Sequence, residues 1–440
     1  MSVMSHLRIA LRNYGPFREG ELEVKPLTII IGTNSSGKSV LAYLLWSLYI
    51  AMPDFSVLAD KLPGRVSEVA ERILGRCKRG EGVSEDFREL LELHVEALPE
   101  AILASLRRIL ERIKPEGLKA LIRGGESSSI IEVRGENSSI TFRIEPDEVL
   151  LEEARLDRDL LKDIEAMCPA PRFLRISFRG RTIEEGYLYG VGDLTSLIIA
   201  SLGYYVRKVF HLAFVGEELI YLLVDGRAGI ARTLLRPYLE PLIAKHLTYP
   251  DERFIALYFR IAEALAKGEV RMRTLRPLLE ELGVEPYAVK RGGVYVVRVK
   301  TWTEVEEDFT GSASGVREAL LPAMALATEG RPYLVILEEP EAHLHPRAQG
   351  KLVEIIAEAV RKGRKAVVMT THNDYVLYKF NNLLLKGLLK PELVAAYLVE
   401  SGDGFSRLVP LEVTEEGVPE DEFSKIAEEL ADERAEALKG

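Results

Sequence analysis

The stretch GTNSSGKS, Gly32–Ser39, decides the fold class of this chain. It follows an apolar run, Leu27–Ile31, that predicts a buried strand, and it leads into Val40–Met52, which predicts a buried helix. A Gly-x4-Gly-Lys-Ser sequence between a strand and a helix is typical of a phosphate-binding P-loop. Its glycines let backbone N–H groups turn toward phosphate oxygens, and the helix N-terminus adds partial positive charge.

We therefore expect this loop to bind a nucleotide together with Mg²⁺. Lys38 would reach the β- and γ-phosphates, and the Ser39 hydroxyl would ligate Mg²⁺. The residues expected to line the nucleotide are Gly32, Thr33, Asn34, Ser35, Ser36, Gly37, Lys38, Ser39 and Val40.

Composition limits the class of protein. The chain has 440 residues, of which 47% are hydrophobic, so two or three compact units are expected. A net charge of −10 excludes a wholly basic nucleic-acid binder but leaves a local basic patch open. The two cysteines, Cys77 and Cys168, predict no disulfide framework and favour a reducing compartment, hence the cytoplasm. No signal peptide or bilayer-spanning segment is expected.

Amide side chains are scarce in this sequence. Gln349 is the single glutamine, beside abundant Glu, Arg and Leu. Proteins from hot environments are depleted in thermolabile amides and enriched in charge networks, so this bias predicts a thermophilic source.

Helix and strand patterns predict an α/β fold in several segments. From Ser314 onward helices and strands alternate. Ile130–Val133 and Ile140–Ile144 alternate apolar and polar residues, which predicts an antiparallel hairpin. The segments expected are an N-terminal part with the P-loop (1–54), a helical insertion (55–124), a β-rich lobe with a helix (125–230), a helical arm (231–285) and a C-terminal part (286–440).

Polar side chains follow two further apolar strands. Tyr333–Leu337 ends at Glu338 and Glu339. A carboxylate that closes a buried strand suits Mg²⁺ coordination in a nucleotide site, and a second carboxylate can polarise the attacking water. Ala366–Met369 ends shortly before His372, which can hydrogen-bond a γ-phosphate if both strands share a sheet with the P-loop.

A fourth element starts at a Ser-Gly pair, Ser314 and Gly315. Small hydroxyl residues and glycine at a helix N-terminus favour anion binding. The order of P-loop, long insertion, Ser-Gly helix start, carboxylate strand and histidine strand resembles the ABC-type ATPases, and among them the SMC/RecF/OLD group. The matching stretches are Asn13–Phe17, Asn34 in the P-loop, Ala313–Val316 as a degenerate signature, Glu338–Pro346 with Gln349 as the Walker B and D-loop region, and Thr371–His372 as the switch histidine.

The resemblance implies a fold, an assembly and roles. The fold is an ABC-type head with a mixed sheet core, an antiparallel β lobe and helical insertions. Two heads dimerise around two ATP molecules and hydrolyse them, to act on DNA or to drive a protein effector in genome maintenance or defence. The implied roles are phosphate binding for Lys38, Mg²⁺ binding for Ser39 and Glu338, water activation for Glu339, γ-phosphate sensing for His372, and contact with the partner's ATP for Ser314 and Gly315.

The sequence also departs from this group. No glutamine lies between the P-loop and the signature, where the family's Q-loop glutamine belongs, so hydrolysis is expected to be slow or partner-dependent. The 68 residues after His372 lack the acidic cluster of the OLD nuclease domain, so no nuclease is expected. Asp225–Gly229 resembles an arginine motif of the group, and no role is predicted for its Arg227.

Three questions stay open at this point. Asp421–Leu438 predicts an amphipathic helix, expected to pack on the head, with docking of a partner protein as the alternative. A transporter's nucleotide-binding subunit and a non-catalytic ATP-clamped module are the alternative functions. A set of basic residues either contacts DNA phosphates or forms a solvated surface, and the sequence favours neither. The set is Arg172, Arg175, Arg179, Arg181, Arg271, Arg273, Arg276, Lys290 and Arg291.

Overall fold

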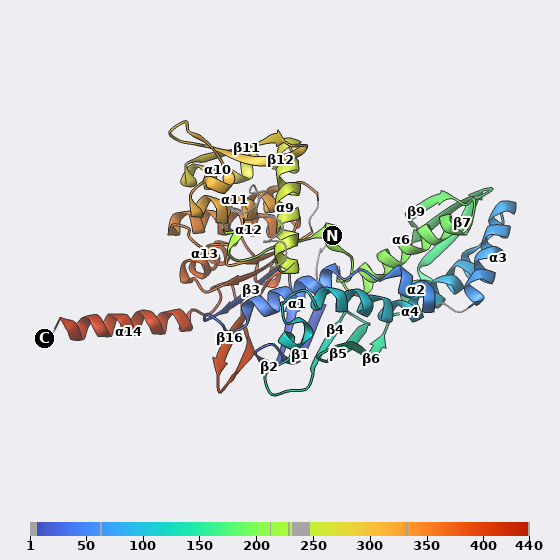
Figure 1. The fold of residues 1–440 in the computed structure, drawn as a ribbon, viewed down its shortest axis with the longest axis horizontal. Coiled ribbons are helices and arrows are strands. Elements are labelled where there is room, and N and C mark those ends of the chain that lie inside the picture. Colours follow the sequence, from blue (N-terminus) through green and yellow to red (C-terminus); the bar gives the residue numbers. More distant parts are fainter. Residues whose placement is uncertain are drawn as a thin grey trace. The chain divides into compact units, whose positions relative to one another are not determined.

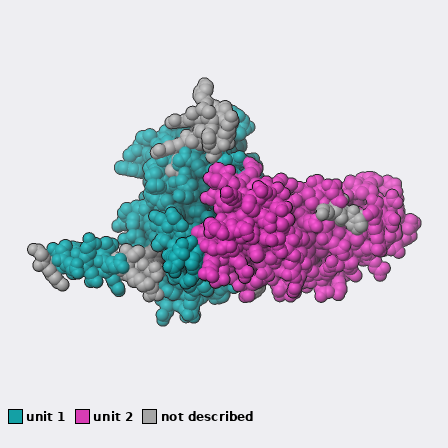
Figure 2. Space-filling view, turned by 60° about the horizontal axis from the view of Figure 1, so that its bottom comes forward, with its two compact units in different colours: residues 1–5, 22–46, 218–440 teal, residues 6–21, 47–217 magenta. Residues whose placement is uncertain are grey.

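A computed structural model describes residues 7–61, 64–211, 213–227, 229–230, 247–330 and 333–438 (Figure 1). The chain divides into two compact units, which Figure 2 colours separately. Unit 1 comprises residues 1–5, 22–46 and 218–440, and unit 2 comprises residues 6–21 and 47–217. Part of the expected helical arm, residues 231–246, lies outside the described residues.

Unit 1 is built on a mixed sheet in which five strands run parallel in the order β10-β14-β15-β3-β16, and β17 pairs antiparallel with β16. Strand β3 is an interior strand, because Leu27 pairs with Val367 on one side and with Val394 on the other. All six residues of β3 are buried, as expected for a parallel strand covered on both faces. The strands are β3 (Leu27–Gly32), β10 (Ile220–Leu223), β14 (Leu334–Glu338), β15 (Ala366–Thr371), β16 (Val394–Gly402) and β17 (Phe405–Leu411).

Helices connect these strands, and the alternation expected from Ser314 onward is confirmed. Helix α12 packs against α10, α11 and α13. A second, antiparallel sheet of three strands has the order β11-β12-β13. The remaining elements are α1 (Lys38–Ile50, whose last four residues belong to unit 2), α9 (Tyr249–Ala266), α10 (Met272–Leu282), β11 (Val284–Arg291), β12 (Val294–Thr301), β13 (Glu306–Asp308), α11 (Ser314–Ala327), α12 (Pro346–Arg361) and α13 (Asp374–Leu385).

Unit 2 contains the antiparallel lobe. Its strands follow the order β2-β1-β4-β5-β6, and the hairpin predicted from Ile130–Val133 and Ile140–Ile144 is the β4–β5 pair. Alternate residues of β1, such as Ile9 and Leu11, are buried, which is the period of a strand with one covered face. The strands are β1 (Leu7–Tyr14), β2 (Phe17–Val24, partly in unit 1), β4 (Ser129–Arg134), β5 (Ser139–Ile144) and β6 (Val149–Arg155).

The rest of unit 2 holds a three-stranded sheet, β7-β8-β9, and the helices of the insertion. The longest helix, α4, packs against α2, α3, α5 and α6. These elements are α2 (Phe55–Lys61), α3 (Arg65–Arg79), α4 (Ser84–Leu110), α5 (Asp159–Lys162), β7 (Ile164–Ala170), β8 (Phe173–Phe178), β9 (Arg181–Tyr187) and α6 (Val191–Val209). The predicted fold class, an α/β head with a mixed sheet core, an antiparallel lobe and helical insertions, is confirmed.

The two cysteines correct one expectation. Cys77 on α3 and Cys168 on β7 form a disulfide, with their Cα atoms 5.4 Å apart. The prediction of no disulfide was wrong because 91 residues separate the two cysteines, and only the packing of α3 against β7 brings them together.

The C-terminal helix corrects a second expectation. The helix itself is confirmed as α14 (Asp421–Ala437). The side chains of residues 428–438 are all exposed, and Leu430 is 60% exposed, so the expected packing on the head is not found for them. These residues are mostly acidic or alanine and offer little apolar surface to bury. Among the described residues, every helix is too short or too polar to cross a bilayer.

Candidate functional site

The P-loop joins the interior strand β3 to helix α1. Gly32 ends β3 beside Val399 of β16, and a Cβ at Gly32 would lie 2.7 Å from the Val399 carbonyl oxygen, so this position requires glycine. Within the loop, Ser35 and Gly37 have positive φ values of 60° and 109°. The hydroxyl of Ser406 on β17 donates to the Ser36 carbonyl at 2.7 Å and fixes the far side of the loop. The loop conformation is therefore set by the sheet on which it stands.

Lys38 is the first residue of α1, and its side chain is only 5% exposed. Its Nζ donates to the carbonyl oxygens of Gly32 at 3.0 Å and Thr33 at 2.9 Å. Burial lowers the pKa of Lys38, although Glu339 acts in the opposite direction. The ammonium is thus held over the P-loop, facing the carboxylates that follow β14.

Glu338 closes β14 and is 1% exposed. Its carboxylate accepts hydrogen bonds from the hydroxyls of Ser39 and Tyr43, and its Oε2 lies 3.2 Å from the donating N–H of Asp225. Burial raises the pKa of Glu338. Its Oε1 has no hydrogen-bond partner among the described residues, so one buried oxygen beside Ser39 is left for a ligand.

That orphaned oxygen fits the expected Mg²⁺. Magnesium in nucleotide sites is usually held by one or two protein oxygens together with phosphate oxygens and water. The Ser39 hydroxyl and Glu338 supply such a pair. Within the described ranges, no group of three or more His, Cys, Asp or Glu side chains is arranged to hold a metal ion by protein groups alone.

Glu339 adopts a left-handed backbone conformation with φ 39°. Its N–H is shared between the carbonyl oxygen of Thr370 at 3.1 Å and the Thr370 hydroxyl at 3.2 Å. Its Oε1 lies 3.1 Å from Nδ1 of His372 and 3.9 Å from Nζ of Lys38. The structure therefore brings together three predicted residues that the sequence separates by up to 334 positions (372 − 38).

A buried carboxyl group supports the histidine strand. Glu341 is 3% exposed and accepts a hydrogen bond from the Thr371 hydroxyl. Burial raises the pKa of Glu341. The Thr371 hydroxyl also accepts from the N–H of Asn373 at 3.0 Å, so the backbone on both sides of His372 is anchored.

The predicted signature residues lie at the start of α11. Ser314 is exposed, and Gly315 approaches the turn that precedes α12. A Cβ on Gly315 would lie 3.0 Å from the carbonyl oxygen of His343, itself at φ 59°. The signature helix and the predicted D-loop are therefore in close contact, and Ser314 remains open to solvent.

Arg227 lies in the Asp225–Gly229 motif, and no role for it is predicted from the sequence. It follows β10 in an Asp-Gly-Arg turn and is fully buried. One guanidinium nitrogen, Nη1, donates to the Val224 carbonyl at 2.8 Å and to the Glu338 carbonyl at 2.6 Å, and Nη2 donates to the Glu339 carbonyl at 3.1 Å. Nε lies 2.9 Å from Oε2 of Glu318 on α11. The available signal was a charged residue in the turn that follows a buried strand.

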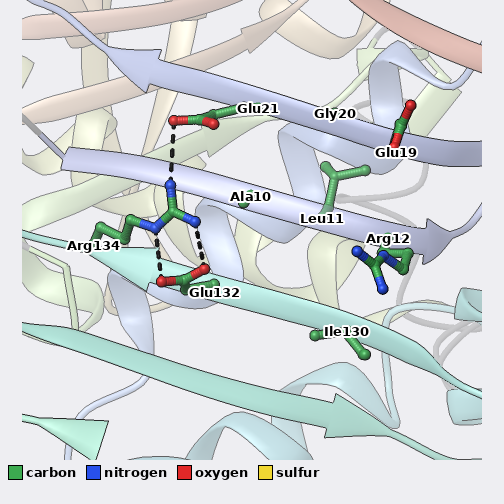
Figure 3. A pocket seen from close by; sticks show the side chains of 9 residues that line it. All are labelled: Ala10, Leu11, Arg12, Glu19, Gly20, Glu21, Ile130, Glu132 and Arg134. Carbon is green, nitrogen blue, oxygen red and sulfur yellow. Dashed lines mark hydrogen bonds and ion pairs between the residues drawn. The ribbon is translucent and has the colours of Figure 1, made fainter. Parts of the chain in front are cut away.

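A groove of about 460 Å³ on unit 2 offers no comparable chemistry (Figure 3). It lies over β1, β2 and β4. Its Arg134 is held by both carboxylate oxygens of Glu132, at 2.7 and 2.6 Å, and by Glu21 at 3.5 Å. With Glu19 also in the lining, the arginines of this groove are matched by acids, and we assign no anion site there.

Two comparisons with known sequences support the predicted class of ABC-type ATPases. Residues 244–377, under a third of the chain, match the family model described as "AAA domain, putative AbiEii toxin, Type IV TA system". The curated relative "Peptidoglycan transport ATP-binding protein YejF" of Agrobacterium fabrum is 27% identical over 141 residues. That alignment spans 32% of this chain and 23% of the relative, so most of the relative's length has no counterpart in the match.

Solved structures similar to this chain include three SMC heads. One is an SMC head bound to the C-winged helix domain of ScpA, 13% identical, covering 93% of this chain and 98% of that one, with a TM-score of 0.46. The SMC head domain from Thermotoga maritima is 14% identical, with 93% and 100% coverage and a TM-score of 0.38. An Smc head with an extended coiled coil, bound to the C-terminal domain of ScpA derived from Pyrococcus furiosus, is 13% identical, with 96% and 98% coverage and a TM-score of 0.44.

The fold and the sequence matches define the class of protein: an ABC-type P-loop ATPase head. The P-loop follows β3, the histidine strand β15 is its neighbour in the sheet, and the carboxylate strand β14 lies on the other side of β15. The family match over residues 244–377 includes the predicted signature, Glu338, Glu339 and His372. The ABC-type class predicted from the sequence motifs is confirmed.

Proposed function

We propose that this chain binds and hydrolyses Mg-ATP as a head of the SMC/RecF/OLD type, and that two copies dimerise on ATP binding. The observation that carries the proposal is the convergence of Lys38, Glu339 and His372 on one edge of the sheet. In this proposal the carboxyl ends of β3, β14 and β15 form one composite site, completed by Ser314 and Gly315 of the second copy.

The residues have distinct roles in the proposed reaction. Lys38 binds the β- and γ-phosphates together with the N–H groups of residues 32–40. Ser39 and Glu338 hold Mg²⁺, which neutralises phosphate charge. Glu339 accepts the proton of the attacking water, and His372, 3.1 Å from it, orients the carboxylate and contacts the γ-phosphate.

The partner is proposed to be a protein effector rather than a DNA duplex. Several basic residues that were candidates for DNA contact are neutralised within the chain: Arg175 by Glu185, Arg179 by Asp163, Arg276 by Glu280 and Arg291 by Asp308. An arginine that is already paired with a carboxylate releases fewer counterions from DNA when it binds a phosphate. These residues are therefore expected to contribute little to DNA binding. The family model's name, a putative toxin of a type IV toxin–antitoxin system, supports a role in defence.

Habitat and location stay predictions. A cytoplasmic chain from a thermophile would reconcile the low amide content with the Cys77–Cys168 disulfide, since intracellular proteins of hyperthermophiles are rich in disulfides.

The test uses the Glu339→Gln and Lys38→Ala variants, with exposed Lys386→Ala as the control. We expect Glu339→Gln to lose phosphate release by about 100-fold or more while it retains nucleotide and dimerises under Mg-ATP. Lys38→Ala should lose nucleotide binding by about 10-fold or more, because charge-assisted hydrogen bonds contribute about 1.5–3 kcal/mol each. Phosphate release and light scattering read out the two steps.

The outcomes separate the alternatives. A stable monomer of Glu339→Gln under saturating Mg-ATP contradicts the dimer. Unchanged behaviour of Glu339→Gln together with no hydrolysis by the native chain supports a non-catalytic ATP-clamped module. Co-purification with a membrane protein supports a transporter subunit, of which the YejF relative is an example by its name. Anisotropy of a labelled DNA duplex that rises only with Mg-ATP would restore DNA as the partner.

A further inference from the structure

Arg227 is a buried charge outside the set of residues to which the proposed reaction assigns roles. A guanidinium removed from water is costly unless its donors are used and its charge is paired. Arg227 is 0% exposed and Glu318 is 1% exposed. Their pairing inside unit 1 therefore has to be specified by the surrounding structure.

The guanidinium holds the end of the carboxylate strand. It donates to the carbonyl oxygens of Glu338 at 2.6 Å and Glu339 at 3.1 Å. Glu339 has φ 39°, a conformation that non-glycine residues adopt only when neighbours hold it. Thr370 binds the N–H of Glu339 and Arg227 binds its carbonyl oxygen, so the strained residue is clamped from both sides.

The other side of Arg227 faces the signature helix. Its Nε lies 2.9 Å from Oε2 of Glu318. Glu318 stands four residues after Ser314, one helical turn further along α11, and helix positions i and i+4 share a face. Any displacement of the N-terminal turn of α11 is therefore transmitted to Glu318, and through it to Arg227.

We propose that Arg227 is a positioning residue that couples the signature helix to the orientation of Glu339 in the same chain. The coupling rests on the proposed ATPase function. Contact of Ser314 and Gly315 with the second copy's ATP sets the position of α11, and the Glu318–Arg227 pair passes that position to the backbone of Glu339. Each copy thereby hydrolyses its own ATP in response to the nucleotide bound by its partner.

Three variants of the full chain test the coupling: Arg227→Lys, Glu318→Gln and the double variant. We measure kcat for ATP, the Kd of a fluorescent ATP analogue and the melting temperature. A lysine keeps the charge but cannot serve three carbonyl oxygens and a carboxylate at once. We expect kcat to fall by about 10–100-fold with the nucleotide Kd changed by less than about twofold, since small misplacements of a catalytic group have effects of this size.

The double variant and a control make the result specific. The double variant should lose no more activity than Arg227→Lys alone, because both changes break one link. Arg298→Lys is the control, since Arg298 is a partly buried arginine paired with Glu306 on the β12–β13 hairpin. Its kcat should stay within about twofold of the native value, because its ion-pair partners, Glu306 and Asp308, have no role in the proposed reaction.

Other outcomes overturn the inference. If folded Arg227→Lys and Glu318→Gln retain native kcat, the coupling is absent. If kcat and nucleotide affinity fall together with the melting temperature, Arg227 is merely structural. If Arg227→Lys does not fold, Glu318→Gln decides by the same criteria. A native chain that hydrolyses no ATP would instead overturn the proposed function, and the coupling would fall with it.

Discussion

Nδ1 of His372 lies 3.1 Å from Oε1 of Glu339. The two residues follow β15 and β14, which are adjacent parallel strands, and Lys38 follows β3, the next strand in the same sheet. The carboxyl ends of parallel strands meet at one edge, so three short apolar strands deliver three chemically different groups to one place. The sheet order accounts for this convergence.

Replacement of His372 tests its role beside Glu339. We expect His372→Ala to lower kcat for ATP by about 10–100-fold, because the carboxylate loses the group that orients it and the γ-phosphate loses a donor. Nucleotide affinity should change little, since the P-loop contacts remain. Steady-state phosphate release and fluorescent-nucleotide binding measure the two effects. Tyr375→Ala, at an exposed position on α13, is the matched control, and a similar loss there would argue for general disturbance of this helix.

The buried carboxylate Glu338 makes stability depend on pH. Burial raises its pKa above 4.5, so between 4.5 and the raised value the folded chain binds more protons than the unfolded chain. The free energy of unfolding therefore falls as pH rises through this window and stays lowered at neutral pH. Glu338→Gln removes that cost, and its melting temperature without Mg²⁺ should exceed the native value at pH 7.5, by about 1–2 °C per kcal/mol relieved.

The gain should shrink toward zero as pH falls below 4.5, where the native carboxyl becomes protonated in both states. Mg²⁺ should no longer strengthen nucleotide binding by Glu338→Gln. Exposed Glu400→Gln serves as the control and should melt at the native temperature at each pH. A melting temperature of Glu338→Gln below the native one at pH 7.5 would show that the carboxylate is stabilising there.

The contact between Gly315 and the His343 carbonyl predicts a specific loss. In Gly315→Ala the new Cβ would start 3.0 Å from that oxygen, so the D-loop has to move by a few tenths of an ångström. We expect ATP hydrolysis to fall by about 10-fold or more, since a small misplacement near a reacting group is costly. Gly350→Ala is the control, because its nearest neighbour is the flexible Lys379 side chain at 3.9 Å. That variant should be more stable by about 0.5–1 kcal/mol.

Phosphate release at saturating ATP and thermal melting distinguish the two glycines. Equal activity of Gly315→Ala and the native chain would mean that the D-loop yields without consequence.

Reduction of the disulfide should weaken unit 2. In a chain with Cys77→Ser and Cys168→Ser, the free energy of unfolding should be lower by about 2–5 kcal/mol. The reason is that the disulfide joins residues 91 positions apart and so restricts the unfolded chain. Chemical denaturation with and without dithiothreitol measures the change. Reductant should lower the denaturation midpoint of the native chain and leave the midpoint of the double variant unchanged. Identical midpoints for the oxidised and reduced native chain would mean that the bond does not form in solution.

Local signals account for most of what the sequence predicted correctly. Lys38, Glu338 and His372 each adjoin an apolar strand, and a parallel sheet places such positions at one edge. The roles assigned to them are still proposals. The signature helix was also predicted from its first residues, Ser314 and Gly315.

Long-range contacts were not predictable in this way. The ion pair of Arg227 and Glu318 joins residues 91 positions apart (318 − 227), and its hydrogen bond to the Glu338 carbonyl spans 111. No periodicity encodes such a contact, because it depends on how β10, α11 and β14 pack. The predicted packing of the C-terminal helix on the head was wrong for a related reason, as the exposed Leu430 shows. An apolar stripe predicts a helix, but it does not predict a surface against which the helix packs.

The position of β3 has a consequence for biosynthesis. Residues 27–32 acquire their hydrogen-bonded neighbours only from residues 367–371 and 394–399, which the ribosome delivers more than three hundred residues later. A nascent chain therefore carries its P-loop on an unpaired strand for most of translation, and contacts this remote form slowly. We therefore expect nucleotide binding only when almost the whole polypeptide has emerged, and truncated translation products should not bind ATP.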